Sequence, residues 1–355
     1  MSTNRAYNFN PGPATLPLEV LEEFKDRFMN FGGLSLFEIS HRSKEFEGIL
    51  EDAKHLLTEL MNIPKGYTVL FLQGGASLQF AMVPLNLMDK KAAYSITGYW
   101  SGKAASEAKT VGEVEAAFTS EGANFNRTPK PSEVRPSGSY LHITTNNTIH
   151  GTQYRQFPDT GAIPLVADAS SDIASRVIEV SKFGLIYAGA QKNLGPAGLT
   201  IVIIRNDLIK KSFRTLPAIL KYSTHAENNS LYNTPPVSAI YMMKLVLSWL
   251  KKKGGLPAIE KENTTKAGLI YDVLDKSGFY KTAAERESRS LMNITFTLPS
   301  EDATERFLSE AKKSGLIGLK GHRITGGIRA SVYNAFPMEG ARTLAQFMKK
   351  FEGQQ

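Results

Sequence analysis

Lys192 is the residue of this sequence whose surroundings best suit covalent chemistry. An apolar stretch that ends in small residues precedes it, and the glycine-rich turn Gly195–Gly198 follows it. A lysine at the end of a buried strand loses hydration, which lowers the pKa of its ammonium and provides a nucleophilic amine near neutral pH. Such an amine can form a Schiff base. A lone lysine is more commonly a solvated surface residue, so the assignment depends on the residues that accompany it.

Asp168 supplies a carboxylate at the end of a second apolar run, Pro164–Ala167. In an open α/β sheet, the carboxyl ends of the strands face the ligand crevice. A carboxylate there can keep a pyridine nitrogen protonated, so that the ring accepts electrons from a carbanion. Asp168 could equally be a helix N-cap or a turn residue, and taken alone it leaves both roles open.

A pair of glycines, Gly74 and Gly75, follows the apolar run Thr68–Leu72 and opens a helical pattern. Glycines let the backbone approach a ligand closely, and the free N–H groups of a first helical turn bind phosphate. Most such turns bind nothing, so the pair is weak evidence by itself. It also lacks the lysine spacing of a Walker-A loop and the spaced glycines of a dinucleotide fingerprint.

Three further positions could complete a pocket for an aromatic ligand. Trp100 could stack on a ring and Thr148 could hydrogen-bond a ring hydroxyl, while Asn233 and Thr234 stand directly before a long helical pattern. Each also has an ordinary role as a core tryptophan, a turn threonine or a helix cap, and singly that ordinary role is favoured.

The elements that must position these residues follow a regular order. Short β-rich runs alternate with helical patterns through the first two-thirds of the chain, which is typical of βαβ units around a mostly parallel sheet. The predicted buried strands are Thr68–Leu72, Ala93–Thr97, Tyr140–Thr145, Pro164–Ala167, Leu185–Ala188 and Leu199–Ile204. We therefore expect an α/β fold.

Two helical patterns frame this part of the chain. Apolar residues at the 3.6-residue period from Phe46 to Leu60 predict an amphipathic helix. A second helix is predicted with Pro235 and Pro236 in its first turn and three lysines at its end, followed by Gly254 and Gly255. That end marks a domain boundary.

Beyond this boundary the pattern becomes that of a smaller α+β domain. The predicted elements are a helix over 259–277, a strand over 293–298, a helix over 302–314, a strand-like stretch over 321–333 and a terminal helix. We expect a large domain over residues 16–254, a small domain over 255–355, and an N-terminal segment, 1–15, that packs near the site.

Composition excludes several classes of protein. The 355 residues include no cysteine, which excludes disulfides, thiolate metal sites and cysteine nucleophiles, and we expect no metal site. No secretory signal pattern or membrane-spanning run is present, so we expect a cytoplasmic location and no membrane partner. The formal net charge of +8 is dispersed among acidic residues and forms no polybasic tail, which favours small anionic substrates over nucleic acid.

Several segments together resemble the phosphoserine aminotransferase family of class-V aminotransferases, which are fold-type-I enzymes that depend on pyridoxal 5'-phosphate (PLP). The resemblance extends over essentially the whole chain. The matching segments are Asn8–Pro17, Ile39–Phe46, Val69–Phe80, Gly98–Trp100, Ile186–Ile203, Tyr232–Pro236 and Leu319–Asn334. It implies a large domain with a mostly parallel, seven-stranded sheet, a small α+β domain, and a homodimer whose sites are built from both chains.

The resemblance also implies roles in binding one PLP per subunit. By position, Lys192 is the Schiff-base lysine, Asp168 the partner of the pyridine nitrogen, Trp100 the stacking residue and Thr148 the donor to the ring hydroxyl. The implied phosphate ligands are Ala76, Ser77 and Gln191, with Asn233 and Thr234 from the other subunit. Some relatives carry arginine where this sequence has Ser77, so the phosphate would rely more on backbone N–H groups and hydroxyls here.

The resemblance also implies five basic side chains that bind the substrate. Arg329 would bind the α-carboxylate through both of its terminal nitrogens. The substrate phosphate or the glutamate γ-carboxylate would be received by His41, Arg42, His322 and Arg323. The implied reaction is reversible amino transfer between O-phospho-L-serine and 2-oxoglutarate in serine biosynthesis. Some family members also accept 4-phosphohydroxy-L-threonine in pyridoxine biosynthesis, and the sequence leaves that open.

Two alternatives stand beside this interpretation. Another enzyme of the same fold, such as an alanine–glyoxylate-type aminotransferase or a desulfurase-like lyase, would share most motifs, although a desulfurase requires a cysteine that this chain lacks. A protein whose main task is nucleic-acid binding is suggested only by the positive charge.

Overall fold

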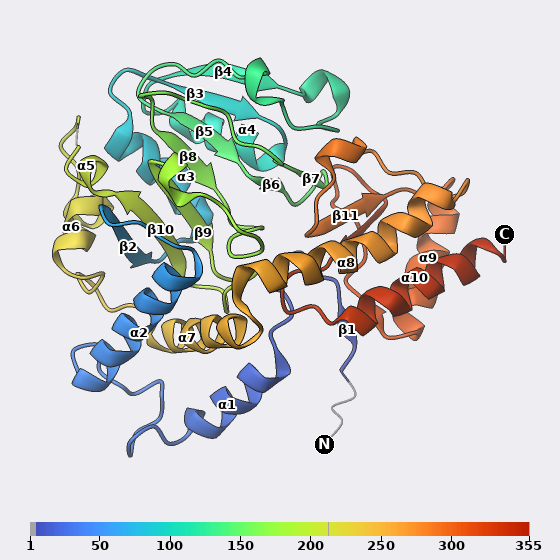
Figure 1. Cartoon of the computed structure of the whole chain (residues 1–355), viewed down its shortest axis with the longest axis horizontal. Coiled ribbons are helices and arrows are strands. Elements are labelled where there is room, and N and C mark those ends of the chain that lie inside the picture. Colours follow the sequence, from blue (N-terminus) through green and yellow to red (C-terminus); the bar gives the residue numbers. More distant parts are fainter. Residues whose placement is uncertain (1–4, 212, 355) are drawn as a thin grey trace.

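The computed structural model describes residues 5–211 and 213–354, and its centre is a seven-stranded sheet (Figure 1). Its strands lie in the order β2-β10-β9-β8-β5-β3-β4. They are β2 (Tyr67–Leu72), β3 (Lys91–Ile96), β4 (Glu113–Thr119), β5 (Leu141–Thr144), β8 (Leu165–Asp168), β9 (Leu185–Gly189) and β10 (Thr200–Arg205). β10 runs opposite to the other six strands, which are all parallel to one another. The predicted α/β fold with a mostly parallel sheet is confirmed.

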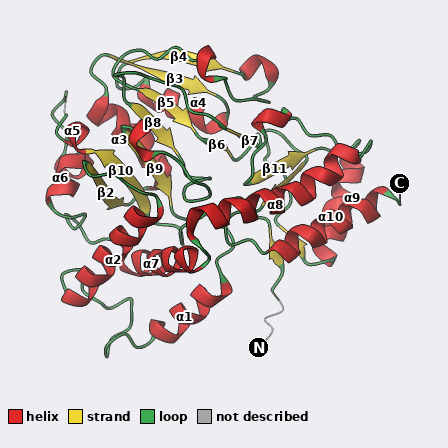
Figure 2. Cartoon of the chain, in the orientation of Figure 1, coloured by secondary structure: helices red, strands yellow, loops and turns green. Residues whose placement is uncertain are grey.

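Helices cover both faces of this sheet, as the distribution of helices and strands in Figure 2 shows. One face packs against α1 (Leu18–Phe28), α2 (Lys44–Leu60) and α7 (Val237–Lys252), and the other against α3 (Gly75–Leu87) and α4 (Tyr99–Ala108). Successive side chains of a strand point to opposite faces. In β10, Ile201 and Ile203 accordingly join the first core, whereas Val202 and Ile204 join the second. Burial on both faces explains why the strands read as continuous apolar runs.

The C-terminal part forms its own core around two small sheets. Its helices and strands are α8 (Gly255–Lys276), β11 (Asn293–Phe296), α9 (Glu301–Lys313), β12 (Leu316–Ile317), β13 (Ile328–Ser331) and α10 (Met338–Glu352). β11 pairs antiparallel with β13, while β12 pairs parallel with β1 (Tyr7–Asn8) from the N-terminal segment. Phe9 is buried in the same core. We propose domains over 16–254 and 255–355, with the N-terminal segment attached to the second.

Four short elements complete the fold. They are β6 (Asn146–Asn147), β7 (Thr152–Gln153), α5 (Asn206–Ile209) and α6 (Tyr222–Glu227). β6 and β7 form an antiparallel pair just beyond the carboxyl end of β5. In the part of the chain that the structure describes, no helix has the length and apolarity needed to cross a membrane.

The structure corrects the predicted strand-like stretch 321–333. Only β13 pairs as a strand there, because residues 322–327 form a turn in which the His322 carbonyl accepts from the N–H groups of Thr325 and Gly326. Gly326 and Gly327 have φ values of 63° and 62°, in the left-handed region, which ends an extended strand. The turn carries His322 and Arg323 clear of the strand.

Candidate active site

Lys192 lies just beyond the carboxyl end of β9, where its amine meets the residues that follow β5 and β8. Its Nζ donates a hydrogen bond of 2.9 Å to the Thr148 Oγ1. Burial lowers the pKa of the Lys192 ammonium to about 8, while the charge of Asp168 acts in the opposite direction and that of Arg329 reinforces the lowering. The free amine is therefore far more populated near neutral pH than in an exposed lysine.

Asp168 is the last residue of β8, the strand next to β9, and it pairs in register with Tyr187. Only 5% of the residue is exposed, and its Oδ1 accepts from the Ser170 backbone N–H at 2.9 Å. Burial raises the pKa of the Asp168 carboxyl, whereas hydrogen bonds from Ser170 and the charge of Lys192 lower it. The carboxylate thus lies within electrostatic range of the Lys192 amine at one edge of the sheet.

The glycine turn lies at the carboxyl end of β2 and leads into α3. Gly74 has a φ of 85°, and a Cβ built on it would come within 2.6 Å of the Leu78 side chain, so both conformation and space require glycine. Gly75, Ala76 and Ser77 form the first turn of α3, whose backbone N–H groups lack intrahelical partners. Such a helix start is suited to an anionic group.

Gln73, directly before this turn, is held by the segment that precedes α7. The Asn233 Nδ2 donates to the Gln73 Oε1 at 2.7 Å, and the Gln73 Nε2 donates to the Thr234 carbonyl at 2.9 Å. Asn233 and Thr234 therefore lie beside the glycine turn of their own chain.

Trp100 is the second residue of α4 and is partly exposed. Its ring centroid lies 6.5 Å from that of Phe80 on α3 and 5.0 Å from that of Tyr99. Tyr99 in turn lies 5.8 Å from His322 of the turn before β13. The start of α4 therefore lies close to residues of the C-terminal part.

Arg329 on β13 is the buried cation of the site. It is 7% exposed, and its buried Nε has no hydrogen-bond partner among the described residues. Burial lowers the pKa of its guanidinium. Burial, followed by the charges of Arg329 and Arg323, also lowers the pKa of His322. A buried guanidinium with an unpaired N–H suits a carboxylate ligand.

The five predicted substrate cations do not all meet within one chain. Arg329 and Arg323 lie close enough to His322 to lower its pKa, and Arg329 also acts on Lys192. His41 and Arg42 lie between α1 and α2, and no hydrogen bond, ion pair or ring contact among the described residues joins them to the other three.

The N-terminal segment, which was expected to pack near the site, is hydrogen-bonded to the residue before the lysine, a contact that sequence reasoning did not assign to any residue. The Ala14 N–H donates to the Gln191 carbonyl at 2.9 Å. Gly12 has a φ of 142°, and a Cβ built on it would lie 3.4 Å from the Lys192 Cγ. No local pattern reveals a contact between residues so far apart in the chain.

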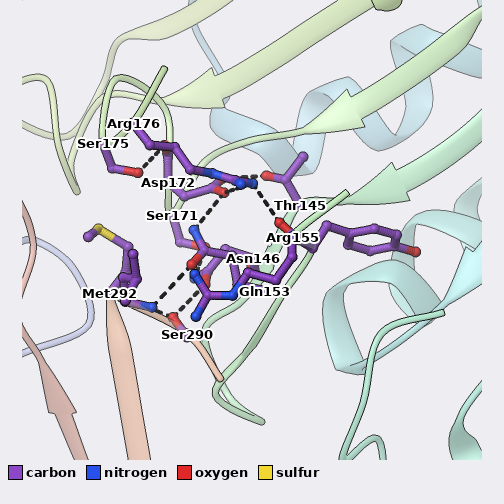
Figure 3. Close-up of polar contacts among 12 residues, drawn as sticks. Thr145, Asn146, Gln153, Arg155, Ser171, Asp172, Ser175, Arg176, Ser290 and Met292 are labelled. Carbon is purple, nitrogen blue, oxygen red and sulfur yellow. Dashed lines mark hydrogen bonds and ion pairs between the residues drawn. The ribbon is translucent and has the colours of Figure 1, made fainter. Parts of the chain in front are cut away.

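A second buried carboxylate, Asp172, was also missed. Figure 3 shows it at the centre of a polar network, in which it accepts from the Thr145 hydroxyl and, at 3.1 Å, from the Gln153 Nε2. The Arg176 guanidinium lies 3.7 Å away. The Gln153 Oε1 accepts from the Leu291 N–H at 3.1 Å, so the network joins the main sheet to the C-terminal part. The only sequence signal was an aspartate four residues beyond Asp168.

The chemistry of these groups fits PLP. A partly buried amine faces the Thr148 hydroxyl, a buried carboxylate stands on the adjacent strand, and a helix start with free N–H groups lies at the same edge of the sheet. The buried Arg329 Nε that lacks a partner supplies a place for the carboxylate of an amino acid. Among the described residues, no group of three or more His, Cys, Asp or Glu side chains could hold a metal ion.

Comparison with known proteins agrees with this arrangement. Residues 6–344 match the model of the class-V aminotransferase family. The phosphoserine aminotransferase of Desulfosudis oleivorans is 54% identical over 356 residues, which cover 99% of both proteins. The structure of phosphoserine aminotransferase from Bacillus circulans subsp. alkalophilus has a TM-score of 0.97 and 49% identity, and covers 99% of each chain. PLP-bound phosphoserine aminotransferase from Trichomonas vaginalis has a TM-score of 0.93 and 37% identity, and the match covers 97% of this chain and 100% of that one. The chain therefore belongs to the class-V aminotransferases of fold type I and, among them, to the phosphoserine aminotransferases.

Proposed function

We propose that the chain transfers an amino group reversibly between O-phospho-L-serine and 2-oxoglutarate, giving 3-phosphooxypyruvate and L-glutamate, as a step of serine biosynthesis. The observation that carries the proposal is the meeting of three groups, two at one edge of the main sheet and one on β13 of the C-terminal part, whose charge acts on the first. These are the Lys192 amine, whose pKa is about 8, the buried Asp168 carboxylate and the buried Arg329 guanidinium. Family membership supports the same reaction.

One PLP per subunit, attached to Lys192 as a Schiff base, would provide the electron-accepting ring that stabilises negative charge at the substrate Cα. Asp168 would hold the ring nitrogen, Trp100 would stack on the ring and Thr148 would hydrogen-bond its hydroxyl. The phosphate would be held by Ala76, Ser77 and Gln191. The free N–H groups at the start of α3 support this assignment. The family resemblance also assigns to the phosphate Asn233 and Thr234 of the partner subunit, residues that in their own chain are hydrogen-bonded to Gln73.

Lys192 would then move the proton of the reaction. As a free amine it removes the proton from the substrate Cα, and as an ammonium it returns a proton later. A pKa near 8 suits both roles, since either form is reached at small cost around neutral pH. The hydrogen bond to Thr148 orients the amine when it is free.

One pocket would serve both substrates, because each carries an α-carboxylate and a second anionic group. Arg329 would bind the α-carboxylate. The second anion would meet His322 and Arg323 of one chain and His41 and Arg42 of its partner in a homodimer. Among the described residues, no hydrogen bond, ion pair or ring contact joins the two pairs within one chain, which supports a shared site. We further propose a cytoplasmic enzyme whose partners are small anions, with neither nucleic acid nor membrane.

The visible absorption spectrum tests this function. The purified enzyme should be yellow, and phosphoserine should bleach the absorbance of the lysine-bound cofactor while 3-phosphooxypyruvate forms. Alanine should leave the spectrum unchanged, and bleaching by alanine alone would favour an alanine–glyoxylate-type enzyme instead. The same assay with 4-phosphohydroxy-L-threonine decides whether that compound is a second donor. Colourless protein that binds DNA in a strongly salt-dependent way would favour the nucleic-acid alternative.

A further inference from the structure

A second buried lysine, Lys266, takes no part in the proposed reaction. It lies on α8, is 0% exposed, and its Nζ contacts three backbone carbonyls. The distances are 2.7 Å to the oxygen of Tyr333, 3.2 Å to that of Asn334 and 3.1 Å to that of Phe336. An ammonium has three N–H donors, so these carbonyls use its full capacity.

This arrangement is costly for a purely structural residue. No carboxylate forms an ion pair with Lys266 among the described residues, since Glu262, the nearest acid on the same helix, pairs with Lys253 at 3.1 Å. Burial without a paired acid disfavours the ammonium form. A methionine would fill the same space without the cost of burying a charge. The hydrogen bonds to the three carbonyls are therefore what a lysine provides here and a methionine could not.

The three carbonyls belong to the turn 333–336, which follows β13 and lies against the active site. The Tyr333 hydroxyl donates to the Pro11 carbonyl at 2.8 Å and accepts from the Asn293 Nδ2 at 3.1 Å. Burial raises the pKa of the Tyr333 hydroxyl, and the Thr148 side chain lies close enough to lower it against that larger effect. Thr148 is the residue that accepts from the Lys192 amine.

Asn334 forms a second route from this turn to the same lysine. Its backbone N–H donates to the Asn193 Oδ1 at 3.0 Å, and Asn193 is the residue after Lys192. The Asn334 Nδ2 donates to the Ala174 carbonyl at 2.8 Å, and its Oδ1 accepts from Asn263 of α8 at 2.9 Å. The turn 333–336 is thus hydrogen-bonded to α8 on one side and to Asn193, next to Lys192, on the other.

We propose that Lys266 is a positioning residue for amino transfer. By fixing the turn 333–336, it holds Asn334 against Asn193 and Tyr333 beside Thr148. These contacts in turn place the Lys192 amine. The contacts of Lys266 with the turn do not depend on which substrate binds. The reaction for which they would position the amine rests on the proposed function. Lys266 touches neither substrate nor cofactor and acts only through the turn.

Hydrogen–deuterium exchange of full-length Lys266→Met, with and without PLP, tests the positioning. We expect exchange to rise by at least about tenfold both in 333–336 and in 190–194, while β8 and β10 keep wild-type protection. Lys261→Met, an exposed lysine on the same helix, is the matched control and should change neither segment. Faster exchange in 333–336 with unchanged 190–194 would show a local structural role and overturn the proposal.

Kinetics provide a second readout. In Lys266→Met we expect kcat to fall by about 10- to 100-fold because the amine is misplaced, while KM for phosphoserine stays within about threefold, since Arg329 is held in β13 by its pairing with β11. Should Lys266→Met fail to fold, Asn193→Ala decides, because it removes the side-chain oxygen that accepts from the Asn334 N–H and leaves Lys266 in place. Asn193→Ala with wild-type kcat and wild-type exchange in 190–194 would refute the inference. Altered exchange in 190–194 without any phosphoserine activity in the wild type would instead reject only the proposed function.

Discussion

The Lys192 amine and the Thr148 hydroxyl lie 2.9 Å apart although 44 residues separate them in the sequence. Thr148 lies just beyond β5 and β6, and Lys192 lies just beyond β9, so the sheet order brings the two strand ends together around β8, which carries Asp168. The bond places the amine beside the Thr148 hydroxyl, where the charge of Asp168 acts on it.

Replacement of Lys192 by alanine should abolish the covalent attachment of PLP. We expect the absorbance of the lysine-bound cofactor to disappear and amino transfer to fall by at least about 10³-fold, because both the attachment point and the proton carrier are lost. Absorption spectra of the variant after incubation with PLP check this. A wild-type spectrum in Lys192→Ala would disprove the assignment. Replacement of Lys261, an exposed lysine of α8, should preserve the covalent absorbance and so serves as the comparison.

The pH dependence of PLP uptake by the apoenzyme should report the amine directly. Only the free amine condenses with an aldehyde, so the uptake rate should rise with pH around a midpoint near 8, well below the value for an exposed lysine. The negative charge of Asp168 stabilises the ammonium, and the positive charge of Arg329 destabilises it. Asp168→Asn should therefore move the midpoint down and Arg329→Gln should move it up. Shifts in the same direction would contradict this electrostatic account.

Arg329→Gln should weaken binding of both substrates. Loss of a charge-assisted hydrogen bond pair costs about 1.5–3 kcal/mol, which corresponds to a fall of about 10- to 100-fold in kcat/KM for phosphoserine and for 2-oxoglutarate. Separate half-reactions with each substrate measure the two effects, and the unchanged cofactor absorbance is the control. If only one substrate were affected, the two substrates would not share one carboxylate site.

Asp172 should matter for stability more than an exposed acid does. Asp172→Ala leaves Arg176 buried without its carboxylate, and we expect the free energy of unfolding to fall by about 3 kcal/mol. Asp207, which pairs with Arg205 at the surface, is the matched control, and Asp207→Ala should cost less than about 1 kcal/mol. Urea unfolding of the two variants measures the difference. Equal losses would show that the Asp172 network contributes no more than a surface pair.

Local patterns in the sequence predicted the strands and the residues at their ends, because buried strands read as apolar runs and parallel strands end at one edge. Asp168 and Lys192 were found in this way. The edge strand β4 was not predicted, since it is mostly solvent-facing and Ala117 is its only buried residue. The contacts of Ala14 with Gln191 and of Asp172 with Gln153 were missed because they depend on tertiary packing, which no short-range periodicity encodes.

Mixed dimers test whether the active site is shared between subunits. Lys192→Ala removes the amine and Arg42→Ala removes a cation that lies apart from Arg329 in its own chain, so each homodimer should be inactive or nearly so. In a hybrid of the two variants, one site contains both substitutions, whereas the other combines an intact Lys192 with an intact Arg42 from the partner. Hybrids isolated through two affinity tags should therefore recover about half of the wild-type activity, as expected for one intact site of two in a twofold-symmetric dimer. If Arg42 served the site of its own chain, each site of the hybrid would keep one defect and no activity would return.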